Sequence, residues 1–302
     1  MWVQTGALQK LADKPYSAAM LSSVWGFDLE RSEILCRAGE AIGLVIERKG
    51  HYRLTRKGAV LIGLPGVTAL IEHHKILYQD LLNPVGFFKG VEETQLSKFW
   101  PYVFGGGMDL KSSEVEKYSD LMSESQHLVA ADTLAAVNIP SVCRFLDVGG
   151  GKGTFVSELK KIHPKVDAAV FDLPGSHSEN SGHRCIIGSF KEDDLPAGYD
   201  IISLVRILYD HRDETIRDLL GKTYSALDKG GRLIVSEPML GADRPTLWGD
   251  VYFAMYTLAM STGKTRSPDQ VSGFIKDAGF SNVTIHKSAR PFITTVIEAQ
   301  KT

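Results

Sequence analysis

The sequence has little cysteine, no long apolar run and no excess of charge of either sign. Its three cysteines, Cys36, Cys143 and Cys185, are odd in number and far apart. This usage is typical of buried thiols in a reducing cytoplasm and argues against a disulfide framework or a zinc site. No uninterrupted apolar run approaches the roughly 20 residues of a membrane-spanning helix. The start, Met1-Trp2-Val3-Gln4, lacks the basic and then apolar layout of a signal peptide. We therefore expect a cytoplasmic protein without a membrane span or a metal site.

The charge balance argues against a protein that binds nucleic acid non-specifically. Against 34 Lys and Arg there are 36 Asp and Glu, a net charge of −2 over 302 residues. Non-specific binding of nucleic acid needs a clear positive excess, so we expect no nucleic-acid partner. The length allows one large domain or two ordinary ones, at roughly 100–200 residues per domain.

The first hundred residues have a mostly helical pattern. Glu47–Thr55 reads as two short strands around a turn that contains Gly50, and a helix followed by such a wing is the pattern of a winged-helix module. Between Arg31 and Lys57 there are seven Lys or Arg against three Glu. This local excess suits DNA, but we favour the solvated face of a dimerisation or lid module.

Aromatic residues are frequent between Phe87 and Phe104, before three consecutive glycines. They fit either a hydrophobic core or a ligand pocket. The next segment, Glu114–Val137, has apolar residues at helical spacing, Met122 among them, and is predicted to be a long connecting helix.

The pattern changes after Pro140, where short apolar runs alternate with helical segments. The expected strands are Cys143–Val148, Ala168–Leu173, Tyr199–Leu208 and Gly231–Ser236, and the expected helices are Phe155–Ile162 and Glu214–Leu227. Near the end, Ser267 is expected to cap a helix over Pro268–Ala278 that Gly279 closes, and Val283–Lys287 and Phe292–Ala299 to form an antiparallel hairpin. Strands that alternate with helices imply a parallel sheet, so the fold class is an open α/β sheet, mostly parallel.

The most informative motif is the glycine-rich turn after the first of these strands. Asp147 is the last residue but one of the strand, and Gly149, Gly151 and Gly153 then alternate. Glycine allows a backbone to approach a ligand closely. The spacing fits neither the G-x-G-x-x-G of dinucleotide enzymes nor the phosphate loop. A ligand at this turn is expected in a nucleotide-type fold.

A second acidic residue follows at the end of the next expected strand. Asp172 lies 25 residues after Asp147, one helix and one strand further on (172 − 147 = 25). A carboxylate at this place can accept hydrogen bonds from both ribose hydroxyls of an adenosine. We favour this interpretation over that of an ordinary turn residue.

With these motifs the chain resembles the class I S-adenosylmethionine-dependent O-methyltransferases of the plant caffeate and bacterial polyketide type. The resemblance covers nearly the whole chain, from the wing to the last hairpin. Three segments narrow it to the bacterial carotenoid methyltransferases, which methylate the tertiary C1 hydroxyl of hydroxyneurosporene and demethylspheroidene: 99–104, 205–211 and 250–260. The resemblance implies a winged-helix dimerisation and substrate-lid domain over residues 1–107, a connecting helix over 108–139 and a Rossmann-like cofactor-binding domain over 140–302. It also implies a homodimer.

The resemblance assigns roles residue by residue. The expected contacts of S-adenosylmethionine are Asp147, Gly149, Gly151, Gly153, Asp172, Leu173, Ser189, Phe190 and Arg206. The expected substrate-lining residues are Phe104, Met122, Tyr252 and Tyr256. Ser189 and Phe190 stand where the family often has Asp-Met beside the adenine, so this contact is altered.

The largest departure concerns the general base. Where the wider family has His-Asp-Trp, this chain has Tyr209-Asp210-His211. Of the two acidic residues that hold the family's histidine, Glu237 is present, but the other position is Thr265. The family's mechanism therefore cannot be transferred unchanged.

Methyl transfer from a sulfonium is an in-line displacement, and positioning alone supplies much of its acceleration. A tertiary alcohol loses its proton during or after transfer. Two roles stay open for His211, that of general base and that of a cover over the adenine. Tyr209 is expected to hydrogen-bond the acceptor oxygen, and Asp210 to orient either neighbour.

The sequence thus predicts an O-methyltransferase that acts on a hydrophobic small molecule, a hydroxylated carotenoid in the first place. A bacteriochlorophyll precursor or a phenolic polyketide is the alternative substrate. A winged-helix DNA-binding regulator is the alternative from another class. Peripheral contact with a membrane, for access to an apolar substrate, is left open.

Overall fold

The structure is a computed structural model and describes residues 1–63, 65–99, 112–174 and 182–302. The chain divides into two compact units, Met1–Lys75 and Ile76–Thr302, and each is described by itself. The functional division expected at residues 107 and 139 stays a prediction.

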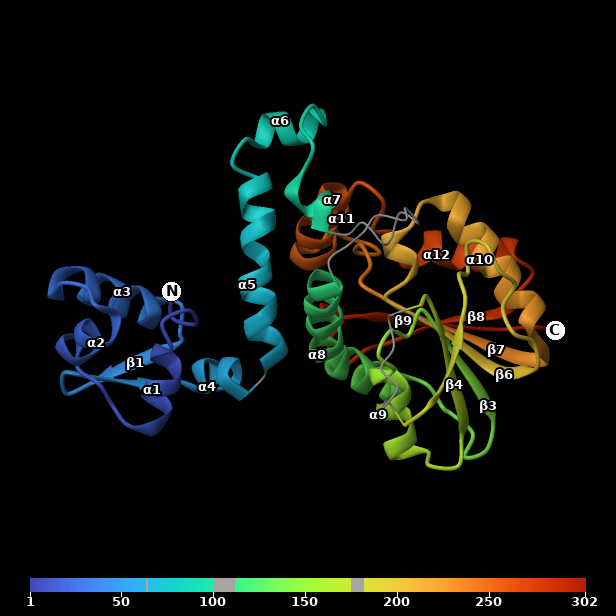
Figure 1. The fold of residues 1–302 in the computed structure, drawn as a ribbon, viewed down its shortest axis with the longest axis horizontal. Coiled ribbons are helices and arrows are strands. Elements are labelled where there is room, and N and C mark those ends of the chain that lie inside the picture. Colours follow the sequence, from blue (N-terminus) through green and yellow to red (C-terminus); the bar gives the residue numbers. More distant parts are fainter. Residues whose placement is uncertain (64, 100–111, 175–181) are drawn as a thin grey trace. The chain divides into compact units, whose positions relative to one another are not determined.

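The first unit is helical with one β-hairpin (Figure 1). Its elements are α1 (Ala7–Asp13), α2 (Ala18–Trp25), α3 (Leu29–Ala41), β1 (Val45–Arg48), β2 (His51–Leu54), α4 (Arg56–Gly63) and the first part of α5 (Pro65–Asp80). Lys49 and Gly50, with φ of 54° and 77°, form the two-residue turn between the paired strands. The expected wing is therefore confirmed, with its first strand starting at Val45.

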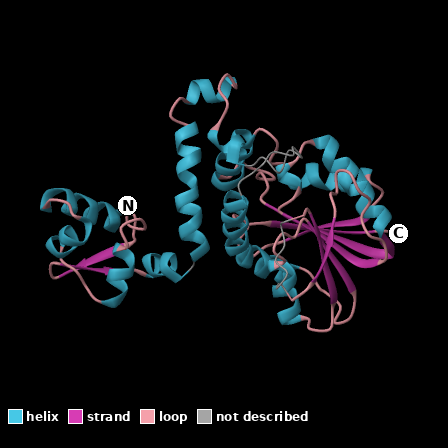
Figure 2. Ribbon diagram, viewed as in Figure 1, coloured by secondary structure: helices cyan, strands magenta, loops and turns pink. Residues whose placement is uncertain are grey.

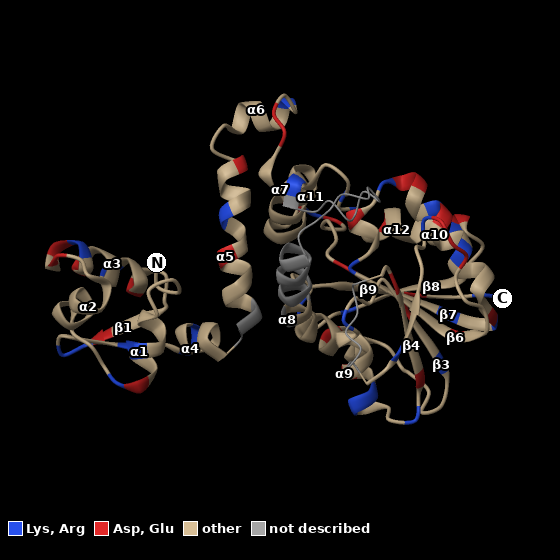
Figure 3. Cartoon of the chain, viewed as in Figure 1, with Lys and Arg blue, Asp and Glu red and all other residues tan. Residues whose placement is uncertain are grey.

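Charges of both signs lie on the helices of this unit, as α3 shows (Figure 3). No single helix in the described part of the chain is long and apolar enough to cross a membrane. One pair of helices, Arg56–Gly63 and Val67–Asp80, together has the length and apolar composition of a membrane span, but the pair is bent by 88°.

The second unit is built on one seven-stranded sheet. Its strands are β3 (Arg144–Val148), β4 (Asp167–Asp172), β5 (Arg184–Ile187), β6 (Tyr199–Val205), β7 (Leu227–Glu237), β8 (Ser281–His286) and β9 (Thr295–Gln300). Its helices are the end of α5, α6 (Pro84–Lys89), α7 (Gln95–Phe99), α8 (Ser112–Ala136), α9 (Thr154–Ile162), α10 (Asp213–Ala226), η3 (Leu247–Phe253), α11 (Ala254–Met260) and α12 (Pro268–Asp277), with a short 3₁₀ turn, η2 (Leu208–Asp210).

The strand order is β5-β4-β3-β6-β7-β9-β8. The first five of these strands run parallel, whereas β9 is antiparallel to both β7 and β8. Helices cover both faces of the sheet (Figure 2). The predicted fold class is confirmed, including the antiparallel C-terminal pair.

Two hydrophobic clusters sandwich the sheet, because successive strand residues point to opposite faces. Phe145 packs with residues of α8 and α9, while its neighbour Leu146 packs with residues of α10 and α12. Ser267 caps α12 and forms a capping box with Gln270, as the sequence predicted for its start.

Two parts of the sheet differ from the expectations. The edge strand β5, of four residues, was not expected from the sequence. The strand expected over Tyr199–Leu208 ends already at Val205, because Arg206 adopts a left-handed backbone with φ of 60° and η2 follows.

The strand order fixes where a ligand binds. The order reverses between β3 and β6, and the loops after β3, β4 and β6 all leave at the carboxyl ends of parallel strands. In open α/β sheets this switch point is the place where ligands bind.

Candidate active site

The glycine-rich loop joins β3 to α9 at the switch point. Gly149, Gly151 and Gly153 all have positive φ, of 71°, 55° and 75°. A Cβ atom at Gly149 would lie 2.3 Å from Cδ1 of Ile207, so a side chain at Gly149 would push the loop away from the segment that follows β6. Beside Gly151 no described atom lies within 4 Å of such a Cβ. The loop is thus packed against the protein at Gly149 and open at Gly151.

Asp147 lies beneath this loop and is 1% exposed. Its Oδ1 accepts a hydrogen bond of 2.5 Å from Ser203 Oγ on β6, and Oδ2 has no hydrogen-bond partner in the described structure. Burial raises the pKa of Asp147 to about 7, although the Ser203 hydrogen bond lowers it. The position supports the loop from below, and a direct contact of Asp147 with a ligand stays a prediction.

Asp172 connects the end of β4 to the glycine loop. Its Oδ2 accepts from the backbone N–H of Gly151 at 2.6 Å, and its Oδ1 accepts from the N–H of Leu173 at 2.6 Å. The structure therefore brings Gly151, Asp172 and Leu173 together, as expected for a site that binds an adenosine.

Phe190 and His211 meet at the next part of the site. Their ring centroids are 5.2 Å apart in an edge-to-face arrangement. Burial, followed by the cations Lys191 and Arg266, lowers the pKa of His211 to about 3. The imidazole is thus neutral at physiological pH and packs as a ring beside Phe190. The hydroxyl of neighbouring Ser189 accepts from the N–H of Lys191 at 3.3 Å.

The carboxylate of Glu237, at the end of β7, holds the turn that follows β6. Its Oε1 accepts from the N–H groups of Ile207 and Leu208, both at 2.8 Å, and its Oε2 accepts from that of Tyr209 at 3.4 Å. In the family, according to the resemblance, this acid orients a histidine. Here Glu237 binds the backbone of the turn instead.

Half-buried Arg206 and buried Tyr209 and Asp210 form a polar cluster around this turn. The guanidinium of Arg206 donates to Ser125 Oγ on α8 at 2.8 Å and also hydrogen-bonds Tyr209, whose hydroxyl hydrogen-bonds Asp210. Oδ1 of Asp210 has no partner among the described residues. The left-handed backbone of Arg206 is strained, and strain of this kind is typical of functional sites.

Two carboxyl groups share this cluster with one cation. Burial, and then the charge of Glu237, raise the pKa of Asp210 well above its usual range. Burial raises the pKa of Glu237 to about 7, against the three N–H groups that lower it. Burial and Asp210 raise the pKa of Tyr209, which is therefore a neutral phenol. The raised pKa values make both carboxylates stronger proton acceptors than exposed carboxylates.

Thr265 occupies the position of the family's second acidic residue. It is 5% exposed, and its hydroxyl lies 3.1 Å from that of Thr257 on α11. Because no histidine needs orienting here, a hydroxyl pair can replace the carboxylate without leaving a buried charge.

The predicted substrate-lining residues are only partly described. The rings of Tyr252 and Tyr256 are tilted by 38° with centroids 6.0 Å apart, and both pack with Leu77, Phe87 and Leu96 in a separate hydrophobic cluster. Phe104 lies outside the described residues. Met122 is a residue of α8, but its side chain is not described. Phe87 therefore contributes to a core, whereas its neighbour Phe88 is exposed.

Some residues of the site were missed by the sequence analysis. Ser203 pairs with Asp147 in the β3–β6 register, and Arg266 donates to the carbonyls of Leu208 and His211. Register and backbone carbonyls leave no mark on a single sequence. Among the described residues no group of three or more His, Cys, Asp or Glu could hold a metal ion.

Comparison with known proteins identifies the family to which this site belongs. Residues 78–281 match the O-methyltransferase domain. Demethylspheroidene O-methyltransferase of Rhodobacter capsulatus is 42% identical over 99% of this chain and 77% of its own length. The enzyme of the same name from Cereibacter sphaeroides is 39% identical over 98% of this chain and 81% of its own. None of these matches supports a DNA-binding regulator.

Solved structures share the fold. Human N-acetylserotonin methyltransferase, solved in complex with S-adenosylmethionine (SAM), superposes with a TM-score of 0.78 at 22% identity, over 99% of this chain and 92% of its own. CalO1, a methyltransferase of calicheamicin biosynthesis, superposes with a TM-score of 0.82 at 19% identity, over 100% of this chain and 92% of its own.

We predict that Asp172→Ala raises the dissociation constant for S-adenosylmethionine at least 100-fold in titration calorimetry. Two hydrogen bonds to a carboxylate contribute about 1.5–3 kcal/mol each, and the substitution removes both. Asp167→Ala, at the opposite end of the same strand, is the matched control and should leave the affinity unchanged. An unaltered affinity of the Asp172 variant would exclude the ribose assignment.

Proposed function

The chain belongs to the O-methyltransferase family, and we propose that it methylates the tertiary C1 hydroxyl of a hydroxylated carotenoid. The methyl donor is S-adenosylmethionine, which supplies an electrophilic methyl group on its sulfonium. The observation that carries the choice of substrate is the identity of 42% and 39%, over 99% and 98% of the chain, to two demethylspheroidene O-methyltransferases.

The residues at the switch point fit the donor. A side chain at Gly149 or Gly153 would collide with its neighbours, while the loop is open at Gly151, and Asp147 holds an unpaired buried oxygen directly beneath it. We assign the methionine portion to Gly149, Gly151, Gly153 and Asp147, with Arg206 near it. We assign the ribose to Asp172 and Leu173, and the adenine to Ser189 and Phe190.

His211 fits a cover over the adenine better than a general base. Its ring packs edge-to-face on Phe190, and the low pKa of about 3 makes its imidazole a weak proton acceptor. Of the two roles that the sequence left open, we therefore propose the cover.

Tyr209 and Asp210 then take the proton of the acceptor. A tertiary alcohol becomes strongly acidic only as its oxygen bonds the incoming methyl group, so a base that ionises it beforehand is not needed. We propose that the oxygen of Tyr209 receives this proton while its own proton passes to Asp210, whose raised pKa suits a carboxylate that accepts it. Positioning the acceptor oxygen about 3 Å from the methyl group supplies most of the rate.

The site's apolar walls suit a long hydrocarbon. Tyr252 and Tyr256 extend a cluster of apolar side chains from α5, α6, α7 and α11, and burial raises the pKa of Tyr252 so that its hydroxyl stays neutral. We propose that both tyrosines line the substrate path, together with Phe104 and Met122.

The wider organisation is proposed as follows. Residues 1–107 form the dimerisation domain and cover the substrate, residues 108–139 form a connecting helix, and residues 140–302 bind the cofactor. The protein is a cytoplasmic homodimer. It contacts membranes peripherally, where its apolar substrate is found. Five large apolar side chains between residues 78 and 91 are each more than 60% exposed: Tyr78, Leu82, Val85, Phe88 and Val91. These exposed side chains are available for contact with a second copy of the chain or with a membrane. A single-chain mass in light scattering would contradict the dimer.

The substrate class is tested by offering labelled S-adenosylmethionine with a mixture of 1-hydroxy-carotenoids, phenols and porphyrins. We expect label in the tertiary methyl ether of a hydroxy-carotenoid. Label confined to a phenol or a porphyrin would support the alternative substrates, a polyketide or a bacteriochlorophyll precursor, and refute the carotenoid assignment.

The proton path is tested by single-turnover transfer at saturating cofactor. We expect Asp210→Asn and Tyr209→Phe to lower the rate about 10²-fold, which is typical for loss of a proton acceptor. His211→Ala should transfer at nearly the wild-type rate but bind the cofactor more weakly.

The pH dependence separates the two roles of the histidine. With a pKa of about 3 the imidazole is deprotonated throughout pH 5–8, so the pH–rate profile of His211→Ala should have the wild-type shape. A rate limb near pH 6 that disappears in His211→Ala would restore the histidine as the base.

A further inference from the structure

The turn η2 has its backbone groups bound by charged side chains from outside the turn. Glu237 binds N–H groups at its start, as described above. At its other end, the guanidinium of Arg266 donates from Nη1 to the carbonyl of Leu208 at 3.1 Å and from Nη2 to the carbonyl of His211 at 2.9 Å. The carbonyl between them, of Tyr209, accepts from the backbone N–H of Lys264 at 2.9 Å.

These contacts match the polarity of the turn. The N–H end of a helical turn carries partial positive charge and the carbonyl end partial negative charge. The carboxylate of Glu237 and the guanidinium of Arg266 therefore each lie at the end they stabilise. A 3₁₀ turn of three residues is too short to be stable alone, and strained Arg206 precedes it, so the outside contacts determine its shape.

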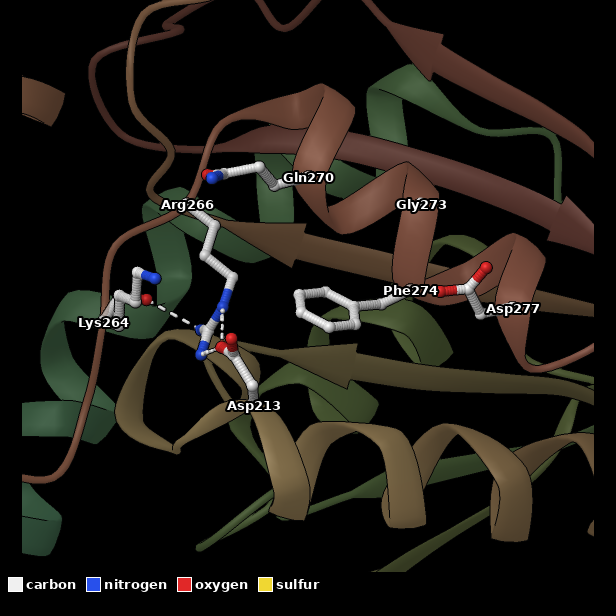
Figure 4. Close-up of a pocket in the computed structure, with 7 residues that line it drawn as sticks. All are labelled: Asp213, Lys264, Arg266, Gln270, Gly273, Phe274 and Asp277. Atoms are coloured by element: carbon white, nitrogen blue, oxygen red, sulfur yellow. Dashed lines mark hydrogen bonds and ion pairs between the residues drawn. The ribbon is translucent and has the colours of Figure 1, made fainter.

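The guanidinium of Arg266 uses all its donors. Arg266 is 3% exposed, and besides the two carbonyls of the turn it donates to the carbonyl of Lys264 at 2.8 Å. It also donates to Oδ1 of Asp213 from Nε at 3.0 Å and from Nη2 at 2.6 Å (Figure 4). A guanidinium has five N–H groups in a fixed plane, which a lysine ammonium cannot reproduce.

We propose that Arg266 is a positioning residue for methyl transfer. Through the carbonyls of Leu208 and His211 it holds the turn that presents Tyr209 and Asp210 to the acceptor hydroxyl. This inference rests on the proposed function, in which those two side chains face the acceptor. A displacement of about 1 Å in such a group lowers a rate about 10²-fold.

The surroundings of Arg266 provide a specific test. A cavity of about 160 Å³ lies beside it, lined by Asp213, Lys264, Arg266, Gln270, Gly273, Phe274 and Asp277 (Figure 4). Truncation of Arg266 enlarges this space by the volume of a planar cation. A guanidinium ion from solution can then reach the carbonyls and Asp213 and replace the missing side chain.

The experiment measures single-turnover transfer to a 1-hydroxy-carotenoid and the affinity for S-adenosylmethionine. We expect Arg266→Ala and Arg266→Lys to transfer about 10²-fold more slowly, with cofactor affinity changed much less. Low millimolar guanidinium should restore Arg266→Ala, and methylammonium should not. Arg217→Ala is the matched control, because Arg217 is exposed and lies 4.6 Å from the Phe274 ring, and it should keep the wild-type rate.

Transfer by Arg266→Ala at the wild-type rate would overturn the proposal, and so would a loss of rate that guanidinium does not reverse. If Arg266→Ala does not fold, Asp213→Asn replaces it, since it removes only the carboxylate that orients Arg266. A reduced rate in that variant would support the proposal, and an unchanged rate would refute it.

A second measurement needs no substrate. Deuterium uptake by the amides of residues 206–213 should rise in Arg266→Ala and fall again with guanidinium. If the wild-type protein transfers no label to any hydroxy-carotenoid, the proposed function fails, while this exchange still decides the positioning role. Equal uptake in variant and wild type would refute that role alone.

Discussion

The active-site geometry depends on the carboxylate of Glu237, which satisfies the N–H groups of the turn after β6. A buried backbone N–H without a partner costs about 1–3 kcal/mol, and three of them converge here. Because Glu237 ends β7, its position follows from the pairing of β7 with β6 in the sheet. The fold thus fixes the turn, and the turn fixes the directions of Tyr209, Asp210 and His211.

The same constraint accounts for the chain's departures from its family. Once Glu237 is committed to backbone groups, it no longer has an imidazole to orient, and a second carboxylate at Thr265 would be a buried charge without a partner. The hydroxyl pair of Thr257 and Thr265 avoids that cost. The histidine of this turn is at position 211, two residues after the place that the resemblance gives to the family's histidine, and it packs on Phe190. The remaining polar groups form a cluster in which Asp210 is the carboxyl that we propose takes a proton late in the reaction.

Much of this arrangement could be predicted from the sequence, because it depends on local chemistry. The glycine-rich loop and Asp172 have spacings that a strand, a loop and a helix impose, and the start of α12 after Ser267 follows from its capping residues. The edge strand β5 could not be predicted, because four residues are too few to show an alternating pattern. The early end of β6 could not be predicted, because the left-handed backbone of Arg206 leaves no periodic signal in the sequence. The roles of Glu237 and Arg266 could not be predicted, because both side chains bind backbone groups, whose partners depend on tertiary structure. For His211 the residue type allowed two roles, that of general base and that of a cover over the adenine, and its burial against Phe190 favours the cover.

We propose that the turn held by Glu237 presents Tyr209 to the acceptor hydroxyl. The most direct measurement is a crystal structure of the protein with S-adenosylhomocysteine and a 1-hydroxy-carotenoid. We expect the carotenoid hydroxyl within hydrogen-bond distance of the Tyr209 oxygen, about 3 Å, with His211 against the adenine. A carotenoid hydroxyl bonded to His211 instead, with Tyr209 turned away, would contradict this proposal.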